Sequence, residues 1–235
     1  SDLASPLMRT YRSRHFYWEE NGLDKQTHSR VMGALTIGKT GTTLRVGYDM
    51  LKNYIYLGLQ NQRVADGDNY LTKGVDVQVR QHGGNVGIFT AQLEQNLQFG
   101  ILHWNSRLTY QKSGDEEVIA LPALNIYTNL FLRFKIARVL QCDLGGDLRW
   151  FTKYYAPEYI PGLSAFGMQE TADSKTKVGG YPLANVYANF NLKHTRFFVM
   201  MSHINASSGG DYFLTPHYPL NGRIFRFGVS WNFFN

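Results

Sequence analysis

The amino-acid sequence predicts an all-β chain: a transmembrane antiparallel up-and-down β-barrel with about ten strands. Three observations lead to this fold class. Apolar and polar residues alternate with period two in one segment after another, and the links between these segments are alternately short and long. No apolar run approaches the roughly 18 residues that a membrane helix needs, the longest being 197–201. We therefore expect the 235 residues to form a single barrel domain, 1–235.

The alternation can be followed through the expected strands in chain order, which are 7–20, 26–38, 42–60, 74–95, 98–112, 120–135, 139–153, 182–192, 195–205 and 222–234. Segment 7–20 is strand-like but too mixed to assign a face, and 195–205 has a continuous apolar centre that hides its facing. The other apolar rows are Val31, Gly33, Leu35 and Ile37; Leu44, Val46, Tyr48 and Met50; Phe89, Ala91 and Leu93; Leu102, Trp104, Leu108 and Tyr110; Leu124, Ile126, Leu130, Leu132 and Phe134; Leu140, Cys142, Leu144, Gly146, Leu148 and Trp150; Ala184, Val186, Ala188, Phe190 and Leu192.

The last strand carries the strongest apolar row, which consists of Phe225, Phe227, Val229, Trp231 and Phe233. In a soluble sheet, so many aromatic rings would need an opposing layer of equal bulk. In an outer-membrane barrel the same row faces lipid, with aromatic side chains at the headgroup level. We therefore expect this row to face lipid.

The links between the strands predict the orientation in the membrane. Links 38–41, 96–97, 136–138 and 193–195 are short, 61–73, 113–119, 154–181 and 206–221 are longer, and 21–25 is intermediate. Short turns lie on the periplasmic side of bacterial outer-membrane barrels. Because ten strands is an even number, both chain ends are expected on that side. A hairpin turn at Lys52-Asn53 or at 82–85 would change the strand count.

Charged side chains fall on the row opposite the apolar one, which would line the lumen. The basic ones are Arg30, Arg45, Arg80, Arg107, Arg133, Lys135, Arg149, Lys153, Arg196 and Arg226, and the acidic ones are Asp49, Asp76, Glu94, Asp143 and Asp147. Because Arg and Lys rings favour anions, an open lumen would prefer anions. The alternative is a lumen held closed by pairs of arginine and carboxylate, which suits a small barrel.

Other function classes find little support in the residues. The formal charge is +6 and the pI about 9.3, but the basic residues are spread along the strands and do not cluster, so we expect no nucleic-acid partner. One cysteine excludes a disulfide framework, and the histidines lack metal-ligand spacing. Ser202 and His203 are adjacent and point to opposite faces of a strand, and Asp143 and Asp147 lie about 13 Å apart along one. We expect no enzyme activity, no cofactor and no metal site.

The long link 154–181 is expected to be an extracellular loop. It combines Tyr154, Tyr155, Tyr159 and Phe166 with two prolines, Pro157 and Pro161. A rigid aromatic loop of this kind could bind a glycan or a protein, or fold inward as a constriction. Alternatively, the loop packs on its own aromatic side chains.

Several phrases of the sequence resemble a known family. The runs 154–162 (YYAPEYIPG) and 218–234 (YPLNGRIFRFGVSWNFF), with the phrases 15–18 (HFYW) and 53–56 (NYIY), are similar to the putative porin family of Bacteroidota outer membranes. The similarity runs through most of the chain. Members of that family are longer, so the resemblance implies that these residues are the C-terminal part of such a protein and an arc of a larger barrel.

The resemblance and the residue pattern together predict an outer-membrane porin-like channel for passive diffusion of small polar solutes. The alternative is a non-conducting structural or docking barrel in a larger outer-membrane complex. The expected partners are outer-membrane lipid, other outer-membrane proteins and the barrel-assembly machinery, because the aromatic end of the last strand is similar to the signal that this machinery reads. Asn235 stands where an aromatic residue is commoner. In a closed ten-stranded barrel, the last strand would pair with 7–20.

Overall fold

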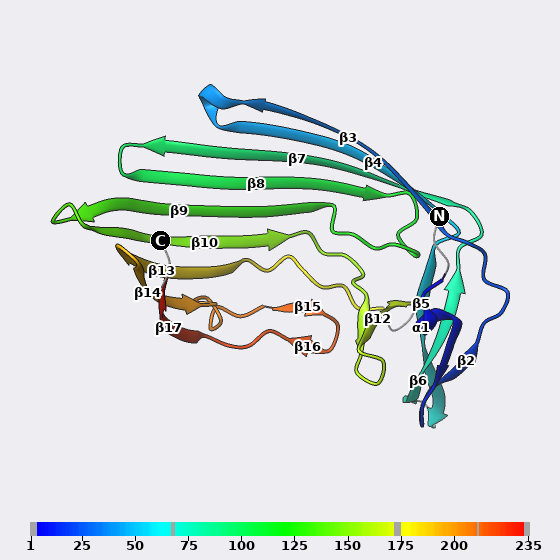
Figure 1. Ribbon diagram of the computed structural model, residues 1–235. Coiled ribbons are helices and arrows are strands. Elements are labelled where there is room, and N and C mark those ends of the chain that lie inside the picture. The colour runs from blue at the N-terminus through cyan, green and yellow to red at the C-terminus, as the bar shows by residue number, and fades with distance from the viewer. Residues whose placement is uncertain (1–3, 67–68, 172–174, 211, 233–235) are drawn as a thin grey trace.

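The computed structural model describes residues 4–66, 69–171, 175–210 and 212–232. Its main body is one curved antiparallel sheet of nine strands (Figure 1) in the order β17-β14-β13-β10-β9-β8-β7-β4-β3. The strands are β3 (Thr27–Ile37), β4 (Thr42–Lys52), β7 (Asn85–Phe99), β8 (Leu102–Ser113), β9 (Leu124–Ile136), β10 (Leu140–Phe151), β13 (Leu183–Leu192), β14 (Thr195–Ser202) and β17 (Ile224–Trp231). The all-β class predicted from the alternation is confirmed.

The links between these strands separate into two rims, as the sequence predicts. Links 38–41, 100–101, 137–139 and 193–194 form the short-turn rim, at the left of Figure 1. Links 53–84, 114–123, 152–182 and 203–223 form the long-loop rim. The last of these contains the small hairpin of β15 (Phe213–Thr215) and β16 (Tyr218–Pro219).

Strand register sorts the side chains onto two faces. Leu44 pairs with Leu35 on one side and with Leu93 on the other, while Arg133 pairs with Asp143. Because side chains alternate between the faces of a strand, the sheet has an apolar face and a polar face. The apolar face exposes large side chains across its whole width, from Val31 on β3 (77% exposed) to Phe227 on β17 (75%). A continuous apolar surface of this kind needs a non-aqueous neighbour.

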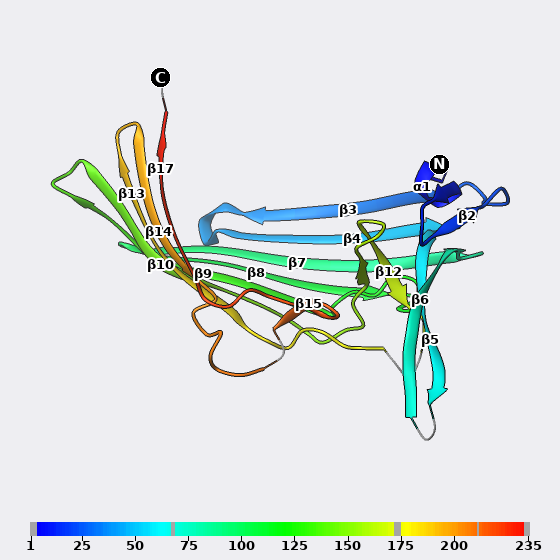
Figure 2. The ribbon, with the colours of Figure 1, turned by 90° about the horizontal axis from the view of Figure 1, so that it is seen from below.

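Two expected strands are each divided by a sharp corner. Segment 42–60 breaks at Asn53, whose φ is 54°, and 74–95 breaks at 82–84, so that β4 pairs with β7. Between the corners, β5 (Ile55–Asp66) and β6 (Asn69–Gln81) leave the sheet as a separate hairpin that stands crosswise to it in both views (Figure 2). The expected loop 61–73 is therefore wrong, because both strands run through most of it. Neither corner is a hairpin turn, since among the described residues β4 does not pair with β5 and β6 does not pair with β7.

Segment 7–20 is not a strand of the main sheet, contrary to the sequence-based expectation. It forms α1 (Pro6–Arg9) and the short strands β1 (Thr10–Arg12) and β2 (Tyr17–Glu19). These pack with β5, β6, β11 (Glu158–Ile160) and β12 (Ala165–Gln169) at the long-loop rim. We call this unit the rim cluster; its buried core consists of Trp18, Leu57, Leu59, Val77, Ile160 and Leu163.

The strand count changes the expected position of the N-terminal end. With nine strands in the sheet, β3 and β17 both run from the long-loop rim to the short-turn rim. The chain therefore enters the sheet at the rim opposite its C-terminal end, and the expectation of both ends on one rim is wrong. Within the described part of the chain, no helix has the length and apolar character that crossing a bilayer requires.

Candidate functional site: the polar face of the sheet

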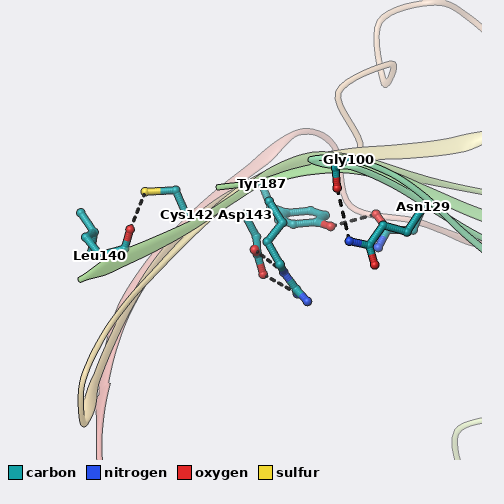
Figure 3. A network of polar contacts seen from close by, with 8 residues as sticks. Gly100, Asn129, Leu140, Cys142, Asp143 and Tyr187 are labelled. Carbon is teal, nitrogen blue, oxygen red and sulfur yellow. Dashed lines mark hydrogen bonds and ion pairs between the residues drawn. The ribbon is translucent and has the colours of Figure 1, made fainter. Parts of the chain in front are cut away.

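The register brings most of the charges expected in the lumen to the polar face. Asp143 reaches the inner side of the curved sheet together with Tyr187, whereas Cys142 lies on the other side (Figure 3). The same alternation and pairing place twelve of the fifteen sequence-predicted charges on this face: Arg30, Arg45, Asp49, Glu94, Arg107, Arg133, Lys135, Asp143, Asp147, Arg149, Arg196 and Arg226.

At the β3 edge, ion pairs bridge neighbouring strands. The carboxylate of Asp49 accepts a hydrogen bond from Nε of Arg30 at 2.6 Å and lies 2.6 Å from Nε2 of His28. Glu94 is shared between two arginines, with Nη1 of Arg45 at 2.7 Å and Nε of Arg107 at 2.8 Å. Glu94 is therefore held by arginines from the strands on both of its sides, whereas Asp49 is held by two side chains of the single neighbouring strand β3.

In the centre of the sheet, the strongest pair joins β9 and β10. Arg133 donates from Nε and Nη2 to the two carboxylate oxygens of Asp143, at 2.8 and 2.9 Å. Asp147 accepts from the amide of Asn185 at 2.9 Å and lies 4.0 Å from Nε of Arg149. This arrangement holds both aspartates in fixed positions within the sheet.

Sequence reasoning assigned no role to the neutral groups that complete this network. The hydroxyl of Tyr187 donates to Oδ1 of Asn129 at 2.9 Å, across the intervening strand β10 (Figure 3). The sequence places both residues in polar rows of their strands, and this is all that it predicts for them. Which residues of neighbouring strands meet depends on the strand register, which cannot be read from a single sequence.

Basic side chains outnumber acidic ones on this face of the sheet. Among the described residues, Arg30, Arg45, Arg107, Arg133, Lys135, Arg149, Arg196 and Arg226 make eight, against four from Asp49, Glu94, Asp143 and Asp147. Arg196 donates to the neutral Asn189 at 2.7 Å, and Arg226 has no ion pair with a described residue. The carboxylates thus leave part of the positive charge unbalanced.

Three of the expected lumen charges lie outside the polar face of the sheet. Asp76 and Arg80 belong to β6 in the rim cluster, where Arg80 donates from Nε and Nη2 to the carboxylate of Glu170, both at 3.1 Å. These hydrogen bonds raise the pKa of Arg80 above its ordinary value. Lys153 follows the last residue of β10 at the long-loop rim. Asp76 and Arg80 were wrongly assigned to the lumen because the chain turns a corner between β6 and β7.

Two clefts open on the polar face near the long-loop rim. The larger, of about 410 Å³, lies over β8, β9 and β10 and is lined by Arg107, Tyr127, Arg149 and Leu214, among others. The smaller, of about 290 Å³, continues from it past Arg149 and Leu183 to Arg226. Arginine side chains therefore line both clefts.

Of the four aromatic residues expected in the extracellular loop, Tyr159 and Phe166 belong to the rim cluster, Tyr154 packs against Phe151 of β10, and Tyr155 lies in the link after β10. Tyr159 packs against Phe166, with ring centroids 5.3 Å apart, and against Tyr218 at 5.6 Å. Lys177 lies 4.8 Å from the ring centroid of Tyr155. Burial raises the pKa of Tyr154. These contacts match the alternative in which the loop packs on its own aromatics.

The last strand places its aromatic row on the apolar face. Phe225, Phe227, Val229 and Trp231 are 58–75% exposed there, and Phe233 lies outside the described residues. Register also settles the facing of β14, which its sequence hides. Phe197 and Val199 pair with Val229 and Phe227 on the apolar face.

No group of residues in the described part of the chain is arranged like a metal site. His203 is buried, and both of its ring nitrogens are engaged, with the hydroxyl of Tyr181 at 2.8 Å and the carbonyl oxygen of Asn221 at 2.7 Å. Its backbone N–H donates to the side chain of Asn185 at 2.9 Å. Through these contacts, His203 connects links 152–182 and 203–223 to strand β13 of the sheet.

Comparison with known proteins agrees with this geometry. A family model described as putative porin matches residues 2–235. Among solved structures, the siderophore receptor PirA from Acinetobacter baumannii is similar at 14% identity and a TM-score of 0.54, covering 91% of this chain and 32% of the receptor. A mutant of the ferric enterobactin receptor PfeA from Pseudomonas aeruginosa is similar at 15% identity and a TM-score of 0.51, covering 80% of this chain and 27% of the receptor. The chain thus spans about a third of these receptors or less, and the likeness concerns the fold. A search among curated proteins finds no match.

Proposed function

The chain belongs to the putative porin family, and on this premise we propose that its polar face lines part of a water-filled channel that passes small polar solutes and prefers anions. The protein is an all-β protein of the bacterial outer membrane with a porin-like role. The solute class, the anion preference and the open state of the lumen are the proposed part. A transport role of this kind needs no catalytic residue.

The observation that carries this proposal is the separation of the two faces. One face is apolar and exposed across nine strands, as contact with lipid requires, while charges and amides gather on the other. On the polar face the carboxylates are held by arginines, but Arg226 and Lys135 have no described acidic partner. Basic groups that line a pore attract anions and repel cations.

Conductance of the full protein in planar bilayers tests the proposal. Under a KCl gradient, the reversal potential should show that chloride is more permeant than potassium. Arg196→Gln and Arg226→Gln should each move the reversal potential toward zero, which means a weaker chloride selectivity, because each removes a positive charge from the polar face. The matched control is Arg138→Gln, which removes the same charge from the turn between β9 and β10 and should leave selectivity unchanged.

Two results would contradict the channel. Clear cation selectivity would refute the role of the basic excess. Absence of conductance in correctly folded protein would favour the alternative, a non-conducting structural or docking barrel, in which the pairs Arg30–Asp49, Arg45–Glu94 and Arg133–Asp143 only stabilise a closed interior.

The partners of this chain belong to the same proposal. Lipid would cover the apolar face, and the barrel-assembly machinery would read the strand that ends in Phe225, Phe227, Val229, Trp231 and Phe233. The loop that carries Tyr154, Tyr155, Tyr159 and Phe166 would serve to hold the rim cluster together. Deleting 160–178 tests this role, since changed conductance with an intact fold would point instead to a constriction.

A further inference from the structure

The larger cleft is built around a row of three side chains at one height of the sheet. Tyr127 on β9 pairs with Arg107 on β8 and with Arg149 on β10. Neighbouring strands lie about 4.8 Å apart, so the two arginines flank the tyrosine from positions about 10 Å apart. The guanidinium carbon of Arg149 lies 5.4 Å from the centroid of the Tyr127 ring, a cation–π contact that orients it.

Both arginines contact carboxylates through Nε, which leaves their terminal nitrogens, Nη1 and Nη2, available to a ligand. Nε of Arg107 donates to Glu94 at 2.8 Å, and Nε of Arg149 lies 4.0 Å from Asp147. No hydrogen bond joins the terminal nitrogens of either guanidinium to a residue that the structure describes. The side chains are 56% and 67% exposed, so a ligand in the cleft can reach these nitrogens. Two terminal nitrogens of an arginine match the two oxygens of a carboxylate.

The rest of the cleft is largely apolar. Phe151 and Leu183 form its wall on the sheet, and Leu214 approaches from the β15 hairpin. The neighbouring Thr215 donates from its hydroxyl to the carbonyl oxygen of Pro157 at 2.8 Å, which ties this hairpin to the loop after β10. An apolar ring could lie against these side chains while its charged group reaches the arginines.

The charges around the cleft favour an anion only moderately. Three guanidinium groups, those of Arg45, Arg107 and Arg149, face two carboxylates, Glu94 and Asp147. The net charge of this group is therefore +1, enough to attract one carboxylate. Because the anionic part alone is weakly held, the apolar wall must supply the remaining affinity and the selectivity.

We propose that this cleft binds small aromatic carboxylates, with Arg107 and Arg149 holding the carboxylate and Phe151, Leu183 and Leu214 holding the ring. The proposal deepens the channel function by naming a solute class, and its physiological meaning rests on that function. Binding itself requires no conductance. The cleft lies near the long-loop rim, where it would meet solutes that enter from that side.

Isothermal titration of the full protein in detergent tests the site with three matched probes. Benzoate has both the charge and the ring, benzamide keeps the ring without the charge, and acetate keeps the charge without the ring. Benzoate should bind at least about tenfold more tightly than either of the others, because benzamide lacks the charge that the arginines bind and acetate lacks the ring that the apolar side chains contact. Equal binding of benzoate and benzamide would overturn the proposal.

Substitutions locate the binding in the cleft. Arg107→Gln and Arg149→Gln should each weaken benzoate about 10- to 100-fold, the range for a charged hydrogen-bonding partner. Leu214→Ala should weaken benzoate severalfold and leave acetate unchanged. The control Arg138→Gln should bind as the unsubstituted protein does. Circular dichroism and the electrophoretic shift of the folded barrel verify each fold, and unchanged benzoate binding in folded Arg149→Gln protein would refute the site.

The two proposals fail separately. Benzoate binding without conductance would remove the channel and keep the site. An anion-selective conductance in a protein that binds benzoate no better than acetate would keep the channel and remove the site.

Discussion

The pair between Arg133 and Asp143 offers a quantitative test of the polar network. The Asp143 side chain is only 12% exposed and receives two charge-assisted hydrogen bonds, at 2.8 and 2.9 Å, whereas the Arg133 side chain is 45% exposed. Hydrogen bonds to charged groups contribute about 1.5–3 kcal/mol, and solvent around a half-exposed arginine reduces this value. We expect Asp143→Asn to lower the free energy of unfolding by about 1–2 kcal/mol.

A double-mutant cycle isolates the interaction itself. Asp143→Asn combined with Arg133→Gln should cost less than the sum of the two single changes, by about 1 kcal/mol. The assay is urea unfolding from lipid vesicles followed by tryptophan fluorescence. The control cycle pairs Asp143→Asn with Arg30→Gln on the far strand β3, where the two effects should add. If the Arg133 cycle is also additive within about 0.3 kcal/mol, the pair contributes nothing and the reasoning is refuted.

Two further predictions concern the faces of the sheet and the rim cluster. Leu93→Lys on the apolar face of β7 should lower the free energy of unfolding in lipid by about 2–4 kcal/mol. Thr90→Lys on the polar face of the same strand should fold into vesicles as the unsubstituted protein does. Equal folded yields of the two variants in vesicles would contradict the assignment of the faces. Burial raises the pKa of Tyr54 and Tyr154, which lie outside the main sheet. Their neutral forms therefore stabilise the fold fully below the ordinary tyrosine pKa of about 10, and this contribution is lost as pH rises through the elevated values. The free energy of unfolding should fall above about pH 10, and it should fall less in Tyr54→Phe protein. Tyrosine absorbance titrations measure the pKa values directly. The raised pKa values would be contradicted if the titration curve of folded protein superimposed on that of denatured protein.

The sequence predicted the faces of the sheet better than the path of the chain. Strand β10 illustrates the success, because Leu144 and Asp143 are assigned to opposite faces by a period of two that any exposed sheet must obey. Strand β14 illustrates the limit. Its central residues are all apolar, and only pairing with β13 and β17 determines that Phe197 lies on the apolar face and Phe198 on the polar face.

The corners were missed for a related reason. The sequence marks Lys52-Asn53 and 82–85 as possible turns, but its pattern does not show that β5 and β6 leave the sheet. The backbone at Asn53 shows the corner, with φ at 54°. Segment 7–20 was misassigned because its large side chains, including Trp18, are buried against Leu57 and Leu59 of β5. Those contacts join residues far apart in the sequence.

The common direction of β3 and β17 restricts how the sheet can be completed. In hydrocarbon, the backbone N–H and C=O groups along both edges of a sheet require hydrogen-bond partners. If β17 paired directly with β3, within one chain or between copies placed edge to edge, the two strands would be parallel, since each runs from the long-loop rim to the short-turn rim. A wall that is antiparallel throughout therefore needs an odd number of additional strands between these edges. Copies of this sheet placed edge to edge cannot supply that arrangement.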